Sequence, residues 1–154
     1  MELTESTEVG EYFAQLVVGA MVPAINQARE ERDLIAATID AYLGTVDSHP
    51  DLYRVLIHES GAPGIHHLTT AAAQTVATHL TQAIGERFRA LGLDAGPAEP
   101  WAYGMVGLLQ TAGDWWITCD QPIDRATLTG YLTTLLAQGI AGVRTTSDTT
   151  ADTP

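Results

Sequence analysis

The chain has 154 residues, of which 45% are hydrophobic, and this is enough for one domain with a buried core of its own. It carries 19 acidic residues against 7 basic ones, for a formal net charge of −12. This balance excludes the clustered cations that neutralise phosphates, so we expect no direct nucleic-acid binding by this chain alone.

The first predicted helix begins near Thr7. Pro23 should kink it or end it early, because proline lacks the N–H that a helix interior uses. A second helix follows the charged run of residues 29–33 and stops before Pro50. In both helices apolar residues recur at spacings of three and four, which is typical of an α-helix with one buried face.

Pro50 suits the first turn of a short third helix. The breaker at residues 61–64 (GAPG) separates it from the fourth and longest helix, whose apolar residues run from Ile65 to Leu91. Gly92 is the expected C-cap, because glycine readily adopts the left-handed conformation that ends many helices.

The second half of the chain contains two further predicted helices. The loop of residues 94–100 leads into the fifth helix, and Asp124 is predicted to cap the sixth. Residues 144–154 are too polar to bury apolar surface, so we expect a folded domain over 1–143 followed by a disordered tail. The pattern as a whole predicts an all-α fold of six helices.

The features that report on cellular location are few. The N-terminus is acidic, and the most apolar run, Leu16 to Ile25, is shorter than the roughly 20 residues that a membrane span requires. Cys119 is the single cysteine, so it cannot form an internal disulfide, and we expect it to be a small buried hydrophobe. These observations favour a cytoplasmic protein.

Candidate catalytic and metal-binding groups cluster around the bend at 61–64. His58 and Glu59 precede it and His66 and His67 follow it, but their spacing lacks the pairs that zinc and di-iron sites use within a helix. Ser60 lacks the Gly-x-Ser-x-Gly elbow of a nucleophilic serine. We therefore expect no catalytic residue, no metal and no other cofactor.

Two polar side chains have ordinary structural interpretations. Arg54 is expected to form a solvated ion pair with a carboxylate such as Asp51. His79 lies among threonines and alanines in the fourth helix, where a partly exposed or hydrogen-bonded role is favoured over a role as ligand or base.

Four stretches of sequence resemble the ligand-binding domain of TetR-family regulators: residues 39–43 (IDAYL), 49–56 (HPDLYRVL), 104–106 (GMV) and 114–117 (DWWI). The order and lengths of the predicted helices agree with that family from about Glu8 to Val143. The resemblance implies a ligand-responsive dimer whose last two helices pack against their symmetry mates as a four-helix bundle.

The family's helix-turn-helix headpiece has no counterpart in this sequence. We therefore expect either a piece of a longer repressor or a headless relative, and direct operator binding by these residues is not expected. Two alternatives to a ligand-sensing module stay open: a dimerisation partner of an intact repressor, and a small-molecule carrier or enzyme.

The resemblance and the aromatic residues together predict a cavity for a small apolar or aromatic molecule between the second, third, fourth and fifth helices. Its predicted lining is Tyr42, Leu56, His66, Trp101, Met105 and Trp115.

The fifth and sixth helices are predicted to form the homodimer interface. Glycines in the fifth helix permit close backbone approach, and the apolar face of the sixth is wider than one neighbouring helix would cover. The predicted interface residues are Gly104, Leu108, Leu128, Leu132, Leu135 and Leu136.

Overall fold

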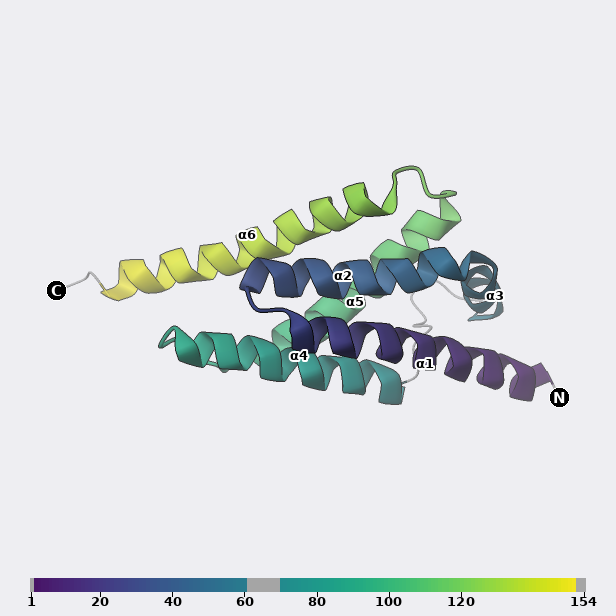
Figure 1. Cartoon of the computed structure of the whole chain (residues 1–154), viewed down its shortest axis with the longest axis horizontal. Helices are drawn as coiled ribbons and strands as arrows, with labels where there is room; N and C mark the ends of the chain where they lie inside the picture. The colour runs from purple at the N-terminus through teal and green to yellow at the C-terminus, as the bar shows by residue number, and fades with distance from the viewer. Residues whose placement is uncertain (1, 61–69, 152–154) are drawn as a thin grey trace.

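The structure, a computed structural model, describes residues 2–60 and 70–151, with side chains placed for residues 8–58 and 71–139. Six helices make up the described chain, which contains no strand, and this confirms the all-α fold. They are α1 (Glu2–Gln27), α2 (Glu31–Ser48), α3 (Pro50–Ser60), α4 (Thr70–Ala90), α5 (Ala98–Thr118) and α6 (Arg125–Ala151) (Figure 1).

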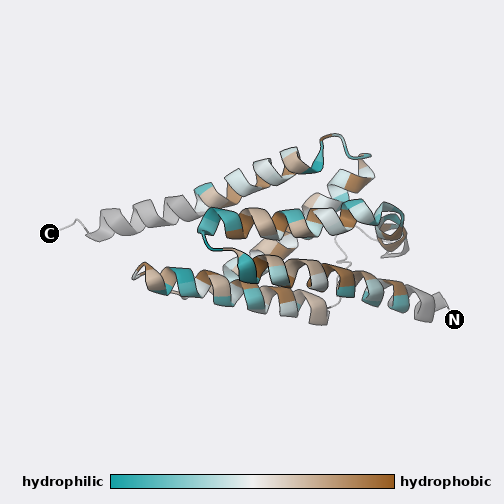
Figure 2. Cartoon of the chain, viewed as in Figure 1, coloured by the Kyte–Doolittle hydropathy of each residue, from teal (hydrophilic) through white to brown (hydrophobic). Residues whose placement is uncertain are grey.

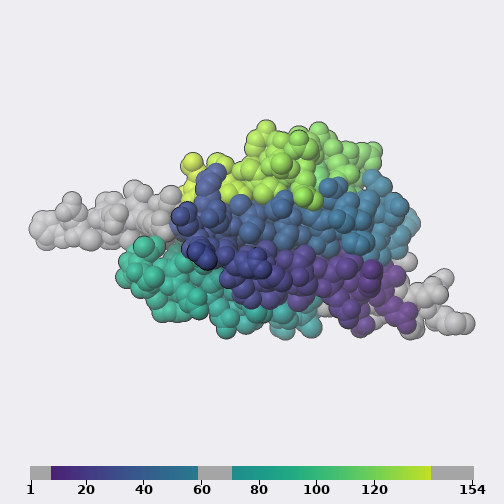
Figure 3. All heavy atoms as spheres, viewed as in Figure 1, coloured from purple at the N-terminus to yellow at the C-terminus, as the bar shows by residue number. Residues whose placement is uncertain are grey.

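Helix α2 lies at the centre of the arrangement, with α1 along one side and α6 along the other (Figure 1). Helix α4 packs on α1 and α5, and the short α3 contacts α1 and α5 at the end of the molecule near the N-terminus. Although α5 and α6 are consecutive, they diverge from the turn that joins them (Figure 1), and α6 packs on α2 instead (Figure 3).

The core lies where α1, α2, α4 and α5 meet. Its largest fully buried side chains include Phe13, Tyr42, Tyr53 and Trp116. Phe13 of α1 contacts Tyr53 of α3, with ring centroids 5.4 Å apart. Hydrophobic residues follow the inner sides of these helices, whereas the turn between α1 and α2 is hydrophilic (Figure 2).

Both predicted helix caps are confirmed. Gly92 has a φ of 72°, and its N–H and that of Leu93 bond to the carbonyls of Arg89 and Phe88, which is the Schellman arrangement. The Asp124 carboxylate accepts a hydrogen bond of 2.7 Å from the backbone N–H of Thr127 in the first turn of α6. Hydrogen bonds from the Thr127 side chain and backbone hold the pKa of Asp124 below its ordinary value.

Several predicted boundaries differ from the observed ones. Helix α1 begins at Glu2 and continues through Pro23 to Gln27, so the expected early end is wrong. Because Pro23 has no N–H, the carbonyl of Gly19 lacks its helical hydrogen-bond donor. Both residues are exposed, so water can bond to that carbonyl instead. The predicted start of the fourth helix at Ile65 lies outside the described residues. Helix α6 runs to Ala151, past the predicted end of the domain at residue 143, and that domain boundary stays a prediction.

Within the described residues, none of the helices has both the length and the hydropathy of a membrane span.

Gly113 is required by the packing of α5 against α2 and α3. A Cβ built there would lie 3.0 Å from Cε1 of Tyr42 and 3.2 Å from the hydroxyl oxygen of Tyr53. Both rings are buried and cannot shift without breaking other contacts, so Gly113→Ala should lower the free energy of unfolding by about 1–3 kcal/mol. The measurement is the denaturant midpoint.

Gly19→Ala is the matched control. Gly19 is also helical, but a Cβ there would meet no atom within 4 Å. Because alanine has a higher helix propensity than glycine, this substitution should stabilise the protein by up to about 1 kcal/mol. Equal effects of the two substitutions would contradict the packing role of Gly113.

Candidate functional site

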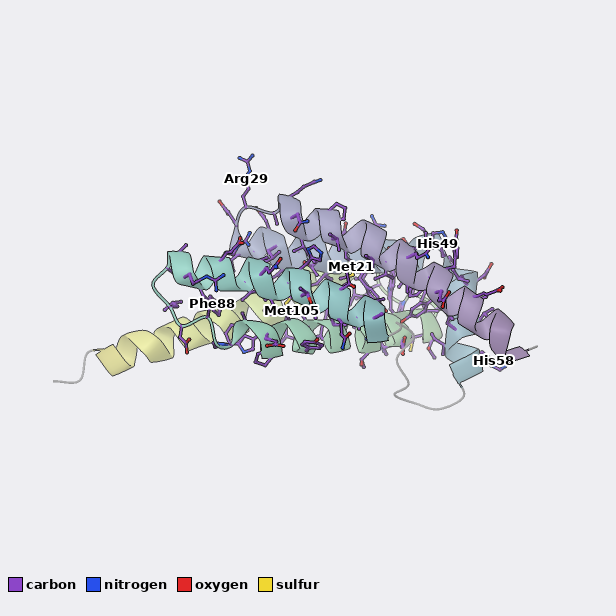
Figure 4. The ribbon with its side chains drawn as sticks, turned by 90° about the horizontal axis from the view of Figure 1, so that it is seen from below. Met21, Arg29, His49, His58, Phe88 and Met105 are labelled. Atoms are coloured by element: carbon purple, nitrogen blue, oxygen red, sulfur yellow. The ribbon has the colours of Figure 1, made fainter. Side chains whose placement is uncertain are left out.

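An apolar groove of about 540 Å³ opens between α4, α5 and α6. The groove exists because α6 packs on α2 and not on α5. The side of α5 turned toward α6 is therefore left without a packed helical neighbour. Figure 4 views the molecule from below, with Met105 and Phe88 between α4 and α5. The residues that line the groove are Ile84, Pro100, Trp101, Gly104, Met105, Leu108, Leu135, Leu136 and Gly139.

The walls of the groove are positioned by packing behind them. The ring of Trp101 is held edge-on against Phe88 of α4, with centroids 5.3 Å apart and planes at 85°. Met105 is buried and also borders a space of about 10 Å³ beside Arg87, close to the size of one water molecule. A Cβ at Gly104 would meet nothing within 4 Å, so the glycine leaves the groove hollow at that point.

Large hydrophobic side chains of α5 and α6 are exposed at the groove and near it. On α6, Tyr131 is 65% exposed and Leu135 61% exposed, and on α5, Trp115 is 47% exposed. Trp115 lies in the same helical stripe as Gly104 and Leu108, at spacings of eleven and seven residues respectively. We call the groove with Trp115 and Tyr131 the α5–α6 face.

The α5–α6 face carries no charge. No Asp, Glu or Arg occurs from Pro100 to Gly113 of α5 or from Ala126 to Val143. Residues 12–28 and 60–85 also lack Asp, Glu and Arg, so the runs of α5 and α6 are two of several long uncharged stretches in a chain with a net charge of −12.

The structure brings only part of the predicted ligand-binding set together. Trp101 and Met105 line the groove, whereas Tyr42 lies in the core between α2 and α3 and Leu56 is buried on α3. Trp115 is exposed beside the groove, and His66 lies outside the described residues.

Four of the six predicted interface residues line the same groove: Gly104, Leu108, Leu135 and Leu136. Leu128 is buried within the chain, and Leu132 is half-buried against the core. Ile84, Pro100 and Gly139 also line the groove but were not predicted as site residues, since nothing local in the sequence brings three separate helices to one groove.

A second cluster, buried and polar, joins α2, α3 and α5. The hydroxyl of Tyr53 donates a hydrogen bond to the Asp114 carboxylate, and it lies 3.2 Å from the Tyr42 hydroxyl and 3.4 Å from the Gln110 backbone carbonyl. Burial raises the pKa of both phenols well above the ordinary value near 10, and for Tyr53 the neighbouring Tyr42 and Asp114 raise it further. The cluster therefore holds both phenols neutral and fixes α3 to α5.

Ion pairs hold the turn between α5 and α6. Arg54 lies 3.6 Å from Asp51, which confirms the predicted pair, and 3.5 Å from Asp120. Arg125 pairs with Asp40 at 3.1 Å. These groups are all substantially exposed, so each pair contributes little to stability, but together they tie this turn to α2 and α3.

The remaining candidate residues have no common site. Cys119 is exposed, which corrects the expectation of a buried thiol: it is the C-cap of α5 and lies beyond the last turn that packs on the core. His79 is half-buried, as expected, and His58 is exposed. Among the described residues, no three His, Cys, Asp or Glu side chains gather as metal ligands would, while His67, like His66, lies outside that part of the chain.

Comparison with known proteins identifies similar domains. The model of the Tetracyclin repressor-like, C-terminal domain matches residues 20–152. The chain is also similar to two proteins described as uncharacterized HTH-type transcriptional regulators, MT0489 and Rv0472c, from Mycobacterium tuberculosis strains CDC 1551 / Oshkosh and ATCC 25618 / H37Rv. Each is 28% identical over 123 residues, which cover 80% of this chain and 52% of the relative. The chain thus spans about half the length of these curated relatives.

Removing the Tyr53 hydroxyl tests the buried polar cluster. Tyr53→Phe deletes the donor to Asp114 in a buried setting, so it should lower the free energy of unfolding by about 1–3 kcal/mol. Tyr103→Phe, at a side chain that is 45% exposed, should change it by less than about 0.5 kcal/mol. Chemical denaturation of both variants measures the difference, and equal stabilities would mean that the cluster contributes nothing.

The same cluster predicts a loss of stability in alkali. Because the pKa values of Tyr42 and Tyr53 are raised in the folded chain, the unfolded chain releases these protons first. The contribution of the two buried phenols to the free energy of unfolding is complete below pH about 10. Above that pH it falls by up to about 1.4 kcal/mol per pH unit for each tyrosine. Denaturation between pH 8 and about 11.5 should show this slope, and Tyr42→Phe/Tyr53→Phe should flatten it. A native slope as flat as that of the double variant would refute the prediction.

Proposed function

Because the chain belongs to the Tetracyclin repressor-like C-terminal domain family, we propose that it is the ligand-binding and dimerisation module of a TetR-type regulator, sensing a small apolar or aromatic molecule. The relatives that carry the name HTH-type transcriptional regulator are about twice as long as the matched segment. In a whole regulator of this kind, DNA binding would belong to the part that this chain does not match. The module itself is non-enzymatic and acts in the cytoplasm.

The α5–α6 face is the observation that carries the proposal of a homodimer. Two copies that each carry a charge of −12 repel one another, and they approach at lowest electrostatic cost through surfaces without charges. The uncharged runs of α5 and α6 supply such a surface. The exposed Tyr131 and Leu135 would leave water on association, which supplies the apolar driving force.

The shape of the face also supports pairing with a second copy. In a two-fold interface the same patch serves both copies, so it needs projections and hollows together. Tyr131 and Leu135 project, while Gly104 and Gly139 leave open space, since a Cβ at either would meet nothing within 4 Å. Four helices, α5 and α6 from each copy, would then form the bundle.

The volume and lining of the groove support the binding of a small molecule. About 540 Å³ lies within the range of roughly 300–1,000 Å³ that is typical of ligand pockets. The lining is aliphatic apart from the indole of Trp101, which offers a flat face to an aromatic ring.

Charge placed on the α5–α6 face should separate the dimer. Leu135→Glu would bury an unpaired carboxylate in the interface, at a cost of several kcal/mol, so the variant should be monomeric at micromolar concentration. Light scattering should give the native chain about twice the 16.4 kDa of one copy and the variant a mass near one copy.

Leu91→Glu is the matched control, because Leu91 is exposed to a similar extent, 57% against 61%, but follows the end of α4 and does not line the groove. It should leave the dimer intact. A native mass near 16.4 kDa, or dissociation by both substitutions alike, would rule out this interface.

A further inference from the structure

A small space lies directly behind the wall of the groove. It measures about 10 Å³, lies between α2, α4 and α5, and shares Ile84 and Met105 with the groove. Two charged residues, Glu31 of α2 and Arg87 of α4, also border it. We propose that this space anchors the polar end of the ligand, through a hydrogen bond from Nε of Arg87 to a neutral acceptor such as a ketone oxygen. The inference rests on the proposed ligand binding and specifies the chemical class of the ligand.

Arg87 has one donor that the described chain leaves unused. Its Nη1 donates a hydrogen bond to the carbonyl of Ala83 at 3.2 Å, and its Nη2 donates to those of Ala28 and Glu30 at 2.8 Å and 3.4 Å. These bonds hold the guanidinium against the turn between α1 and α2. Nε is buried, and it has no acceptor among the described residues. A buried N–H without an acceptor is costly, so a ligand oxygen that reaches it gains a charge-assisted hydrogen bond.

Met105 is the side chain that a ligand moves to reach Arg87. It is buried, and it lines both the groove and the small space. Methionine is unbranched and has three rotatable bonds, so it adapts to a changed neighbour more readily than a branched side chain would. The anchor lies among α2, α4 and α5, so it does not depend on how copies of the chain associate through the α5–α6 face.

The size and charge of the space restrict the ligand. About 10 Å³ is close to the size of one water molecule, so the space admits one small polar group while the apolar body stays in the groove against Trp101. A carboxylate in the space would lose its hydration and lie beside Glu31, in a chain with a net charge of −12. A neutral carbonyl oxygen gains the hydrogen bond without this repulsion. The ligand is therefore an uncharged aromatic or aliphatic molecule with one acceptor at its end.

The probes are two uncharged naphthalenes of nearly equal shape. The ketone 2-acetylnaphthalene carries a carbonyl oxygen, and the alkene 2-isopropenylnaphthalene carries a CH₂ group in its place. The alkene is the more hydrophobic of the two, so an apolar groove alone would bind it more tightly. A hydrogen bond from a charged donor reverses this order. Equilibrium dialysis should therefore show that the native chain binds the ketone about tenfold more tightly than the alkene.

Arg87→Lys tests the donor. Lysine keeps the positive charge and a donor for the carbonyl of Ala28, but it has a methylene group in place of Nε. The preference for the ketone should disappear, while the affinity for the alkene should stay within about twofold of the native value. Arg89→Lys is the matched control, because Arg89 is exposed on α4 and borders neither the groove nor the small space. It should keep the native preference.

Glu31→Gln tests the effect of charge with a third probe, the anion 2-naphthoate. The native chain should bind this anion more weakly than the ketone, because its carboxylate would lie beside Glu31. Glutamine has nearly the shape of glutamate but no charge. The variant should therefore bind 2-naphthoate at least about threefold more tightly than the native chain does, with its affinity for the alkene unchanged.

The results separate failure of the anchor from failure of the proposed ligand binding. If the native chain binds neither uncharged probe, both are rejected. If it binds the alkene as tightly as the ketone, or more tightly, ligand binding stands and the bond to Arg87 is rejected. A ketone preference that survives Arg87→Lys, or that Arg89→Lys removes as well, would also overturn the anchor. An unchanged affinity of Glu31→Gln for 2-naphthoate would contradict the restriction to uncharged ligands.

Discussion

The packing of α6 on α2 determines the rest of the molecule's surface. Consecutive helices commonly pack on one another, but here α2 takes α6 on the side opposite α1, and the turn after α5 is held to α2 and α3 by Arg54 and Arg125. Helices α5 and α6 therefore diverge, and each keeps an apolar side that nothing within the described chain covers. The groove and the exposed aromatic residues both result from the packing of α6 on α2.

The two ends of α5 are adapted to opposite requirements. Toward its C-terminus, Gly113 and Asp114 pack into a dense, hydrogen-bonded cluster around Tyr42 and Tyr53, where one added methyl group would be felt. Toward its N-terminus, Gly104 faces open space. Glycine thus permits close packing at Gly113 and leaves open space at Gly104. The two positions differ only in the side chains that surround them. The rigid end holds α3 and α5 together, and the open end supplies the candidate site.

The distribution of charge agrees with this division. The acidic surface keeps copies of the chain apart wherever it is charged, while α5 and α6 carry long uncharged runs on the side that lacks a neighbour. Hydrophobic exposure and absence of charge coincide at Tyr131 and Leu135 but not at Leu91, which follows a helix with Glu86, Arg87 and Arg89 in its last turns. The proposed self-association and the proposed ligand binding both use the α5–α6 face.

The sequence by itself determined the helices, the caps at Gly92 and Asp124, and the apolar character of α5 and α6. These depend on contacts between residues three or four apart, which a linear pattern records. The sequence predicted two separate sites, whereas Trp101, Met105 and four of the predicted interface residues line a single groove. Only the tertiary structure decided that Ile84, Trp101 and Leu135 line one groove, that Cys119 lies beyond the core and that the Tyr42 hydroxyl lies beside that of Tyr53. The angles at which helices cross depend on side chains far apart in the chain, and no local period encodes them.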